Sequence, residues 1–429
     1  MVTEQLRDAA LAVLHGNDLG DWTKPAPRLY PHQWSWDSAF IAIGLASIDA
    51  DRALRELESL FRAQWEDGRL PHIVFNPAAA DYFPGPERWA TAELTSAAPR
   101  TPRTSGLVQP PVHALALERI WEVGSAAIRK RVETLLPAAI AWHRYLATKR
   151  DPDGSGLLSI YHPWESGTDN SPRWDATFEK LEVGESPAYT RHDLKHVADP
   201  SERPTKAEYD RYLWLVELLK DARYDDAVIH RDHPFLIKDM LMSGIFATAS
   251  EALARLSGSS DVAAWGERAA AGVLRNVSAD GLTLDIDVRA GSPIDVKTCA
   301  GLAWLLVPGL TVDQVQRASD LVFGPWFAGA SGLAHKVVPS TAPGSPGFQS
   351  RSYWRGPSWP HMNWLVWRAL LRNYQEAQAR ELKAQNLALL ARPESRFAEY
   401  FEPFTAEPLG SLDQSWSAAV ALDWLAAAD

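Results

Sequence analysis

The sequence contains almost no cysteine and no long hydrophobic run. Its single cysteine among 429 residues, Cys299, excludes an internal disulfide and any cysteine-based metal cluster, and it fits a reducing compartment. No apolar run approaches the roughly 18–20 residues that a membrane-spanning helix needs. Residues 1–14 are typical of an amphipathic helix rather than of a secretory signal. We therefore expect a cytoplasmic protein that has no membrane partner.

The sequence also lacks a surplus of positive charge. Its 43 Lys and Arg residues stand against 54 Asp and Glu residues, for a formal net charge of −11. A chain of this charge is repelled at long range by nucleic acid and by anionic lipid, so neither is an expected partner. The sequence does not decide between a monomer and a homo-oligomer.

The motifs of several common enzyme classes are missing as well. The chain has no H-E-x-x-H zinc motif, no phosphate-binding loop, no G-x-G-x-x-G and no G-x-S-x-G. Asp151, Asp153 and Ser155 begin like a calcium loop, but His162 stands where that loop requires a bidentate acid. The sequence therefore predicts neither a metal nor an organic cofactor.

Helical periodicity dominates what is present. The range 51–66, for example, opens with Asp51 as a predicted cap and places its leucines on one face. Strand-like runs are few and short, such as 282–288 and 336–338. About a dozen helices are predicted, over residues 3–15, 36–48, 51–66, 110–123, 126–149, 205–221, 234–257, 260–275, 296–306, 312–322, 358–373, 375–391 and 413–428.

Four long loops rich in Pro, Gly and Trp separate these helices, at residues 17–35, 67–109, 151–204 and 324–357. Loops of this length in a compact chain are usually functional or disordered, and these carry too many aromatic residues for disorder. No linker or break in composition is evident, so a single domain over residues 1–429 is expected. The helices could build a solenoid or a closed toroid of helical hairpins. The aromatic, acid-bearing loops favour the toroid, because they could gather at one mouth.

Tryptophan is unusually frequent, with 19 residues. An indole ring suits stacking against the C–H face of a sugar, although indoles also fill large helical cores. The segment 161–175, Y-H-P-W-E-S-G-T-D-N-S-P-R-W-D, combines two indoles with three carboxylates. A carboxyl group against an indole loses solvation, which raises its pKa and suits a general acid in glycoside hydrolysis. The alternative is a turn held together by Asp and Asn side chains.

A second acidic cluster, residues 399–407, could supply the partner base. It places Glu399, Glu402 and Glu407 among aromatic residues, and the residues alone do not choose between these three. The alternative is a solvated group of charges on a loop.

Two further segments also combine aromatic residues with charged ones. Residues 30–40 contain Asp37 at the start of a predicted helix, where an Asp can serve only as a cap. Residues 351–361 precede a Trp-rich helix, and their Arg and Trp residues could form a cation–π contact without any ligand.

At these residues the sequence resembles glycoside hydrolase family 63 and the inverting trehalases. The segment W-E-S-G-T-D-N-S-P-R-W-D is similar to the family signature E-S-G-x-D-x-S-x-R-W. Three more motifs of the same family are matched in the same order, by W-S-W-D-S, Y-W-R-G-P-S-W and E-Y-F-E-P-F-T-A-E-P-L-G-S-L-D-Q-S-W. The resemblance runs from about residue 30 to the C-terminus. It implies an all-α fold, an (α/α)6 toroid, with the loops at about 67–109 and 151–204 covering the site, and inverting hydrolysis by two carboxyl groups.

The resemblance also implies roles for individual residues. Asp169 takes the place of the general acid and Glu399 that of the general base. Recognition positions for the sugar and around the scissile bond are matched by Tyr30, Trp34, Asp37, Tyr82, Gln109, Trp164, Tyr353, Trp354, Trp359 and Gln414.

Small bacterial members of the family, which hydrolyse glucosylglycerate or mannosylglycerate, are the most similar in length and loops. Arg203 and Tyr209 match positions that hold the glycerate carboxylate there, and a guanidinium offers a carboxylate two parallel charged bonds. Alternatively, Arg203 pairs with Glu202 or Glu208 on the surface. We therefore expect glucosylglycerate as the substrate. The alternatives are that the substrate is mannosylglycerate or a neutral disaccharide, or that the chain is a sugar-binding protein with an inactive site. A helical-toroid epimerase would need a His pair instead.

Overall fold

Six helical segments form a closed inner ring in the computed structural model, which describes residues 2–79, 82–195, 197 and 199–427. Each segment packs on the next, and the last returns to the first. Every residue of α2 is buried, as expected of a helix that is apolar on all sides. The ring consists of α2 (Ser35–Ala46), α6 (His113–Val123), α11 (Met240–Ser257), the 3₁₀ segment η6 (Cys299–Leu306), α14 (Pro360–Arg372) and α16 (Ser415–Ala426).

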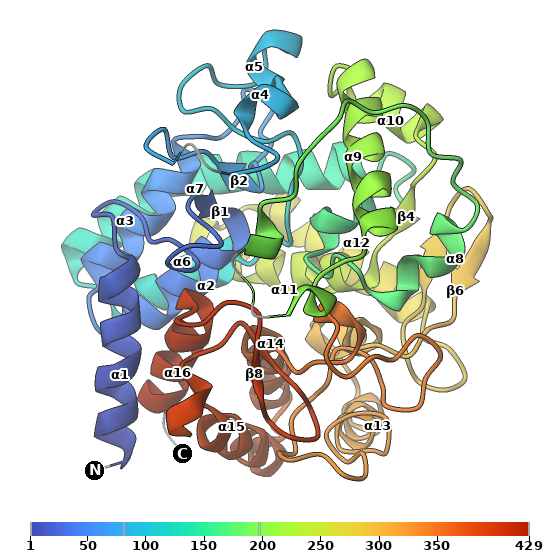
Figure 1. Cartoon of the computed structure of the whole chain (residues 1–429). Coiled ribbons are helices and arrows are strands. Elements are labelled where there is room, and N and C mark those ends of the chain that lie inside the picture. The colour runs from blue at the N-terminus through green and yellow to red at the C-terminus, as the bar shows by residue number, and fades with distance from the viewer. Residues whose placement is uncertain (1, 80–81, 196, 198, 428–429) are drawn as a thin grey trace.

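Six outer helices alternate with the inner ones along the chain and pack around them (Figure 1). They are amphipathic: α3 buries Leu54, Leu57 and Leu60 against the ring. Helices α1 and α16 pack together, so the first and last helices close the circle. This arrangement is an (α/α)6 toroid and confirms the predicted fold. The outer helices are α1 (Val2–Asn17), α3 (Ala50–Phe61), α7 (Ala126–Tyr145), α12 (Ser260–Arg275), α13 (Val312–Val322) and α15 (Glu376–Leu390).

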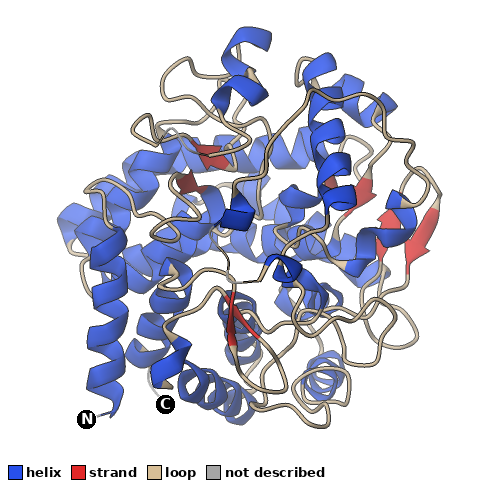
Figure 2. Cartoon of the chain, viewed as in Figure 1, coloured by secondary structure: helices blue, strands red, loops and turns tan. Residues whose placement is uncertain are grey.

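Short elements lie in the long connecting loops, where Figure 2 shows the few strands in red. The strands pair antiparallel as β1–β2, β3–β4–β5–β6 and β7–β8. They are β1 (Gln33–Trp34), β2 (Ile73–Val74), β3 (Ser159–Ile160), β4 (Ile237–Lys238), β5 (Asp285–Asp287), β6 (Ser292–Ile294), β7 (Tyr400–Phe401) and β8 (Pro408–Leu409). The additional helices are α4 (Pro86–Trp89), α5 (Thr91–Leu94), α8 (Asp175–Phe178), α9 (Lys206–Asp221) and α10 (Asp226–Asp232). The loops also contain one π turn, η1 (Leu146–Arg150), and short 3₁₀ turns. The 3₁₀ turns are η2 (Pro163–Ser166), η3 (Pro172–Trp174), η4 (Asp193–Lys195), η5 (Pro200–Glu202), η7 (Tyr353–Arg355) and η8 (Pro393–Ser395).

Several local predictions were wrong for identifiable reasons. Asp49, not Asp51, caps α3, because its side chain accepts the bond from Arg52 N while Asp51 lies inside the first turn. The predicted helix 234–257 begins only at Met240, since the preceding residues pair with two strands as β4. Short apolar runs do not distinguish a strand from the start of a buried helix.

Other predicted elements also differ in extent or type. The range 296–306 forms a 3₁₀ helix from Cys299, and 336–338 forms no strand. The helix predicted over 413–428 ends at Ala426, and its last residue lies outside the described ones.

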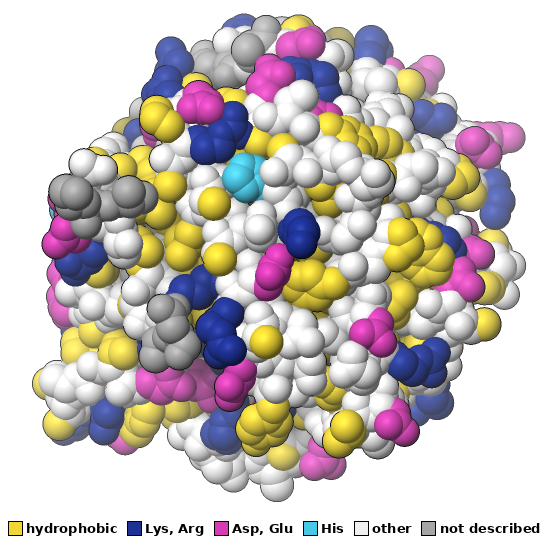
Figure 3. Space-filling view, turned by 90° about the horizontal axis from the view of Figure 1, so that it is seen from below, with side chains coloured by type: hydrophobic (Ala, Val, Ile, Leu, Met, Phe, Trp, Pro, Cys, Tyr) yellow, Lys and Arg dark blue, Asp and Glu magenta, His cyan; other side chains and the backbone are white. Residues whose placement is uncertain are grey.

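The distribution of surface charge and the character of the helices are those that the composition leads us to expect. Figure 3 shows acidic and basic side chains interspersed on one face rather than gathered by sign. Among the described residues, no helix combines the length and the apolar character that crossing a bilayer requires.

Candidate active site

A cavity opens where the N-terminal ends of the inner helices meet the long loops. Its wall includes all of the predicted site residues except Trp359 and Gln414. The inner helices supply Trp36, Asp37 and Trp416, and helix α9 supplies Tyr209 and Tyr212. The remaining residues come from the long connections between the helices. The cavity is lined by Arg28, Leu29, Tyr30, Trp34, Trp36, Asp37, His72, Tyr82, Phe83, Pro84, Gln109, Trp164, Gly167, Asp169, His192, Asp193, Arg203, Pro204, Tyr209, Tyr212, Tyr353, Trp354, Glu399 and Trp416.

Only one of the three carboxylates in segment 161–175 faces this cavity. Glu165 is fully buried and forms two 2.7 Å bonds with Arg150. Asp175 pairs with Arg355 at 2.6 Å. Asp169 lines the cavity and has no ion-pair partner among the described residues. Burial is the main cause that raises the pKa of Asp169, to about 7.

The turn that carries Asp169 is tightly held on both sides. Gly167 has φ +72°, and a side chain there would collide with the ring of Trp36, so the turn requires glycine. Tyr212 donates a 3.0 Å hydrogen bond to the carbonyl oxygen of Asp169. The next residue, Asn170, accepts a 2.8 Å bond from Trp354 N. These contacts fix the backbone from which the Asp169 carboxyl projects.

Arg173 anchors the same turn to the inner ring. Its guanidinium bonds Thr168 Oγ1 at 2.6 Å and Asp239 at 3.1 Å, and it also contacts Asp285. Asp239 caps α11 by accepting from Met242 N. The Arg of the signature therefore has a structural role beside Asp169.

The second acidic cluster likewise presents a single carboxylate to the cavity. Glu402 accepts bonds from Phe404 N and Thr405 N and so closes a turn. Glu407 is exposed and pairs with Arg351. Glu399 is completely buried and lines the cavity.

Both oxygens of Glu399 are held. The Tyr30 hydroxyl donates to Oε1 at 2.6 Å, and Ser411 N donates to Oε2 at 3.0 Å. Burial raises the pKa of Glu399, while the charge of Arg203 and these hydrogen bonds oppose that rise. A substituent on Gly410, with φ +70°, would meet the Glu399 carboxylate, so this position requires glycine.

Asp37 is a third carboxylate in the cavity, and it is buried. It lies in the first turn of α2, whose cap position, Trp34, makes no side-chain cap bond, so a capping role does not explain Asp37. Burial, followed by the charge of Glu399, raises its pKa well above the usual range.

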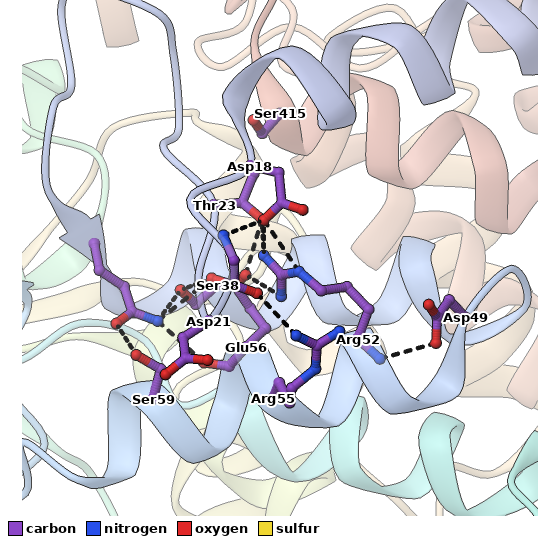
Figure 4. Close-up of polar contacts among 12 residues, drawn as sticks. Asp18, Asp21, Thr23, Ser38, Asp49, Arg52, Arg55, Glu56, Ser59 and Ser415 are labelled. Atoms are coloured by element: carbon purple, nitrogen blue, oxygen red, sulfur yellow. Dashed lines mark hydrogen bonds and ion pairs between the residues drawn. The ribbon is translucent and has the colours of Figure 1, made fainter.

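The neighbour of Asp37 is tied to helix α3 by a polar network (Figure 4). Ser38 Oγ donates to Glu56 at 2.6 Å, and Arg52 lies 3.0 Å from the same carboxylate. Thr23 adds a further bond to Glu56 at 2.9 Å. These contacts hold the start of α2 against α3.

Aromatic rings form much of the wall, and the two predicted residues outside it lie directly behind. Trp359 stacks on Trp354 with ring centres 3.8 Å apart. Gln414 accepts a 2.6 Å bond from the hydroxyl of Ser411, the residue whose backbone holds Glu399. Both therefore support cavity residues instead of lining the cavity.

Arg203 points into the cavity, not to the surface acids considered as its alternative partners. Glu202 pairs with Arg351, and Glu208 closes the capping box of α9. The Arg203 guanidinium lies 4.2 Å from the ring centre of Tyr353, and its Nη1 donates to the Tyr30 hydroxyl at 3.2 Å. Its side chain is 8% exposed.

Sequence reasoning missed several residues of the wall. Trp36 and Trp416 belong to quoted motifs, so position within the motif was an available signal. Tyr212, His72 and Asp193 lie in segments without such a signal, and only the fold brings them to the cavity.

The turn at residues 151–157, which begins like a calcium loop, binds the side chain of Lys238. Lys238 Nζ lies 2.8 Å from Asp153 Oδ1 and 2.9 Å from Leu157 O, and it also approaches Asp151. Within the described ranges, no three His, Cys, Asp or Glu side chains come together as a metal site.

The comparisons with known proteins agree with this geometry. The sequence profile of the family described as mannosylglycerate hydrolase MGH1-like glycoside hydrolase domain matches residues 30–417. A glucosylglycerate hydrolase from Mycolicibacterium hassiacum is 44% identical, with 98% of each chain covered. A mannosylglycerate hydrolase from Thermus thermophilus is 40% identical, with 97% of this chain and 99% of the relative covered.

Solved structures extend the likeness to the fold. A family 63 mannosylglycerate hydrolase from Thermus thermophilus, in complex with Tris and D-glycerate, superposes with a TM-score of 0.90 at 40% identity, covering 98% of this chain and 99% of that one. The neutral trehalase from Saccharomyces cerevisiae, with a TM-score of 0.55 at 14% identity, covering 95% of this chain and 74% of that one, shares the fold alone. The chain belongs to the mannosylglycerate hydrolase MGH1-like family of glycoside hydrolases, within glycoside hydrolase family 63.

Proposed function

We propose that this glycoside hydrolase cleaves 2-O-α-D-glucosyl-D-glycerate to glucose and glycerate with inversion, with Asp169 as general acid and Glu399 as general base. One observation carries the proposal. Asp169 and Glu399 line the same cavity as the guanidinium of Arg203. The cavity therefore combines two carboxyl groups for hydrolysis with a cation for an acidic aglycone.

The acid and base roles follow from the surroundings of the two groups. Asp169, with a pKa of about 7, keeps a proton near neutral pH and can give it to the glycosidic oxygen. Arg203, Tyr30 and Ser411 all favour the ionised form of Glu399. Glu399 can then take a proton from the water that attacks the anomeric carbon from the opposite face. An inverting pair needs about 6.5–9.5 Å between its carboxyl groups to admit that water.

The remaining cavity residues would bind the sugar and exclude bulk water. Asp37 and Gln109 offer polar groups to the sugar hydroxyls, and Trp34, Tyr82 and Trp164 offer ring faces. Trp359 and Gln414 would act indirectly, through Trp354 and Ser411. In this proposal residues 1–429 form one catalytic domain, and the loops at about 67–109 and 151–204 cover the site.

The acidic aglycone is supported by Arg203 and Tyr209, and by the name of the 44% identical relative. A buried guanidinium that faces a cavity suits a carboxylate, whereas a neutral aglycone offers it no ion pair. We further propose that the enzyme acts in the cytosol on this small glycoside, without a nucleic-acid or membrane partner.

Mannosylglycerate is the second candidate substrate. It is favoured by the description of the matching family and by the 40% identical relative from Thermus thermophilus. The two substrates differ by one epimeric hydroxyl, so the acid, the base and the aglycone contacts would be the same.

Proton NMR of the purified protein tests the proposal. Glucosylglycerate, mannosylglycerate and trehalose are incubated in parallel, and the anomeric region is followed from the first minutes. Early β-glucose from glucosylglycerate alone would support the substrate, the hydrolysis and the inversion together. Early α-glucose would contradict the inverting pair. Release from trehalose with none from either glycerate would leave the acid and base in place and contradict the role of Arg203.

A further inference from the structure

Asp193 is a cavity residue to which neither the sequence motifs nor the reaction above assigns a role. It opens the short turn η4 within the loop that covers the site. Arg191 grips its carboxylate with two hydrogen bonds, 3.0 Å from Nε to Oδ1 and 2.6 Å from Nη2 to Oδ2. Arg191 is itself fixed by a 2.6 Å bond to Pro204 O and by the ring of Tyr209, 4.5 Å away. The position of the Asp193 carboxylate is therefore determined by several contacts.

Asp193 stands beside the guanidinium that the proposed function assigns to the aglycone carboxylate. Its Oδ2 lies 3.5 Å from Arg203 Nε, and both side chains line the cavity. Within the described part of the chain, Arg203 Nε is buried without a hydrogen-bond partner. A donor and an acceptor thus lie next to each other at the aglycone end of the cavity.

The Asp193 carboxylate also keeps unused acceptor capacity. Its side chain is 12% exposed, and the bonds from Arg191 and the charge of Arg203 hold its pKa below the usual range despite burial. It is therefore ionised at neutral pH. A carboxylate offers about four lone-pair sites, of which Arg191 occupies two. A ligand group that meets it must be a donor, because a second carboxylate would be repelled.

We propose that Asp193 is a specificity-determining residue that accepts a hydrogen bond from the free hydroxyl of the aglycone while Arg203 binds the carboxylate of the same aglycone. The inference rests on the proposed function. In glycerate the carboxylate and the hydroxymethyl group are attached to the same carbon, so they reach adjacent partners. The pair of residues would select a hydroxy-acid aglycone over one that carries the carboxylate alone.

The test compares two glucosides that differ by this hydroxyl. Glucosylglycerate and 2-O-α-D-glucosyl-D-lactate both carry the carboxylate, but lactate has a methyl group in place of the hydroxymethyl group. A hydrogen bond to a charged group changes kcat/KM by about 10- to 100-fold. The wild-type enzyme is expected to prefer the glycerate compound by this factor.

Three variants assign the preference to Asp193. Asp193→Ala should bring the ratio of the two kcat/KM values close to one by lowering only the value for glucosylglycerate. Arg203→Gln should lower both values together, because both substrates carry the carboxylate. Glu185→Ala, an exposed carboxylate of the same loop, should change neither. Asp193→Asn keeps the shape and one acceptor oxygen and should retain part of the preference.

The outcomes separate the two proposals. Equal kcat/KM for the glycerate and lactate glucosides in the wild type would overturn the role of Asp193 and leave the proposed function intact. An equal loss on both substrates in Asp193→Ala and Asp193→Asn would show that Asp193 only holds the loop through Arg191, which also overturns it. No glucose from either substrate in the wild type would overturn the proposed function, and this inference with it.

Discussion

Charged side chains are arranged differently at the two ends of the inner helix ring. At the N-terminal ends, Asp37, Asp169 and Glu399 lie around one cavity, where Arg203 Nη1 is 3.9 Å from Glu399 Oε1. At the C-terminal ends lies a second depression, in which acids and arginines alternate as close pairs. These pairs include Arg119–Asp423, Arg255–Glu118, Arg255–Glu251, Arg368–Glu118 and Arg372–Glu251, with separations of 2.5–3.1 Å.

Helix electrostatics favour this division. The N-terminal end of a helix stabilises negative charge and the C-terminal end stabilises positive charge. Arg255 and Arg372 lie in the last turns of α11 and α14, and Asp37 lies in the first turn of α2. The paired end uses its charges for structure, whereas burial at the other end raises carboxyl pKa values and leaves protons available for chemistry. The site is therefore marked by carboxyl groups that face a cavity, with one guanidinium 3.9 Å from Glu399, rather than by the number of charges.

The largest effects are expected at the cavity end. Asp169→Asn and Glu399→Gln should each lower kcat by about 10³-fold, because one proton transfer of the reaction is lost. Steady-state kinetics with glucosylglycerate measures this, and circular dichroism checks the fold. Glu407→Gln is the matched control, since Glu407 is exposed and paired with Arg351, and it should retain activity within about twofold. An inactive Glu407 variant beside an active Glu399 variant would identify Glu407 as the base.

The pH profile should show the titration of Asp169. Its pKa is raised to about 7, and only the protonated form can act as the acid. As the pH rises through 7 that form is lost, so kcat/KM should fall about tenfold for each further pH unit. A profile that stays flat to pH 9 would contradict the assignment. The fall should disappear with a glucoside whose leaving group needs no protonation, such as glucosyl fluoride.

The paired end should respond in stability rather than in activity. Glu118→Gln would leave Arg255 and Arg368 without their shared carboxylate. These arginine side chains are 52% and 31% exposed, so water compensates in part, and we expect a loss of about 1–2 kcal/mol in the free energy of unfolding. Urea unfolding measures the loss, and kcat should remain within about twofold. A large loss of activity without a loss of stability would break the division between the two ends.

The smallest effect is a gain of stability at the cavity end. The folded-state pKa of Asp169 lies above its ordinary value, so the folded protein loses stability as the pH rises from about 4 to 7 and the carboxyl ionises in a buried place. Asp169→Asn cannot ionise and should raise Tm by about 2–5 °C at pH 8. Differential scanning calorimetry should show a smaller gain at pH 5. An equal gain at both values would point to packing instead of charge.

Predictability from sequence differed between the helices and the site. Several periodic helices were predicted to within a residue, as at 205–221 and 260–275, because burial of one face repeats along the chain. The helix predicted over 51–66 ends five residues early, at Phe61. The start of α11 was placed wrongly, since β4 exists only through its pairing with β3 and β5. The cavity wall contains most of the residues that the motifs suggested, but Asp193 and Tyr212 reach it from segments without a motif.

Sequence alone determined the helical class, the exclusion of an internal disulfide and the two acidic segments, because periodicity and composition are local properties. Choosing among the carboxylates of those segments required tertiary structure. Glu165 differs from Asp169 by the Arg150 that pairs with it, and Glu407 differs from Glu399 by Arg351 and exposure. Those arginines lie at sequence distances of 15 and 56 residues from the glutamates they bind. Folding decides which carboxyl groups are held in close ion pairs away from the cavity, and therefore which ones face it and can exchange protons.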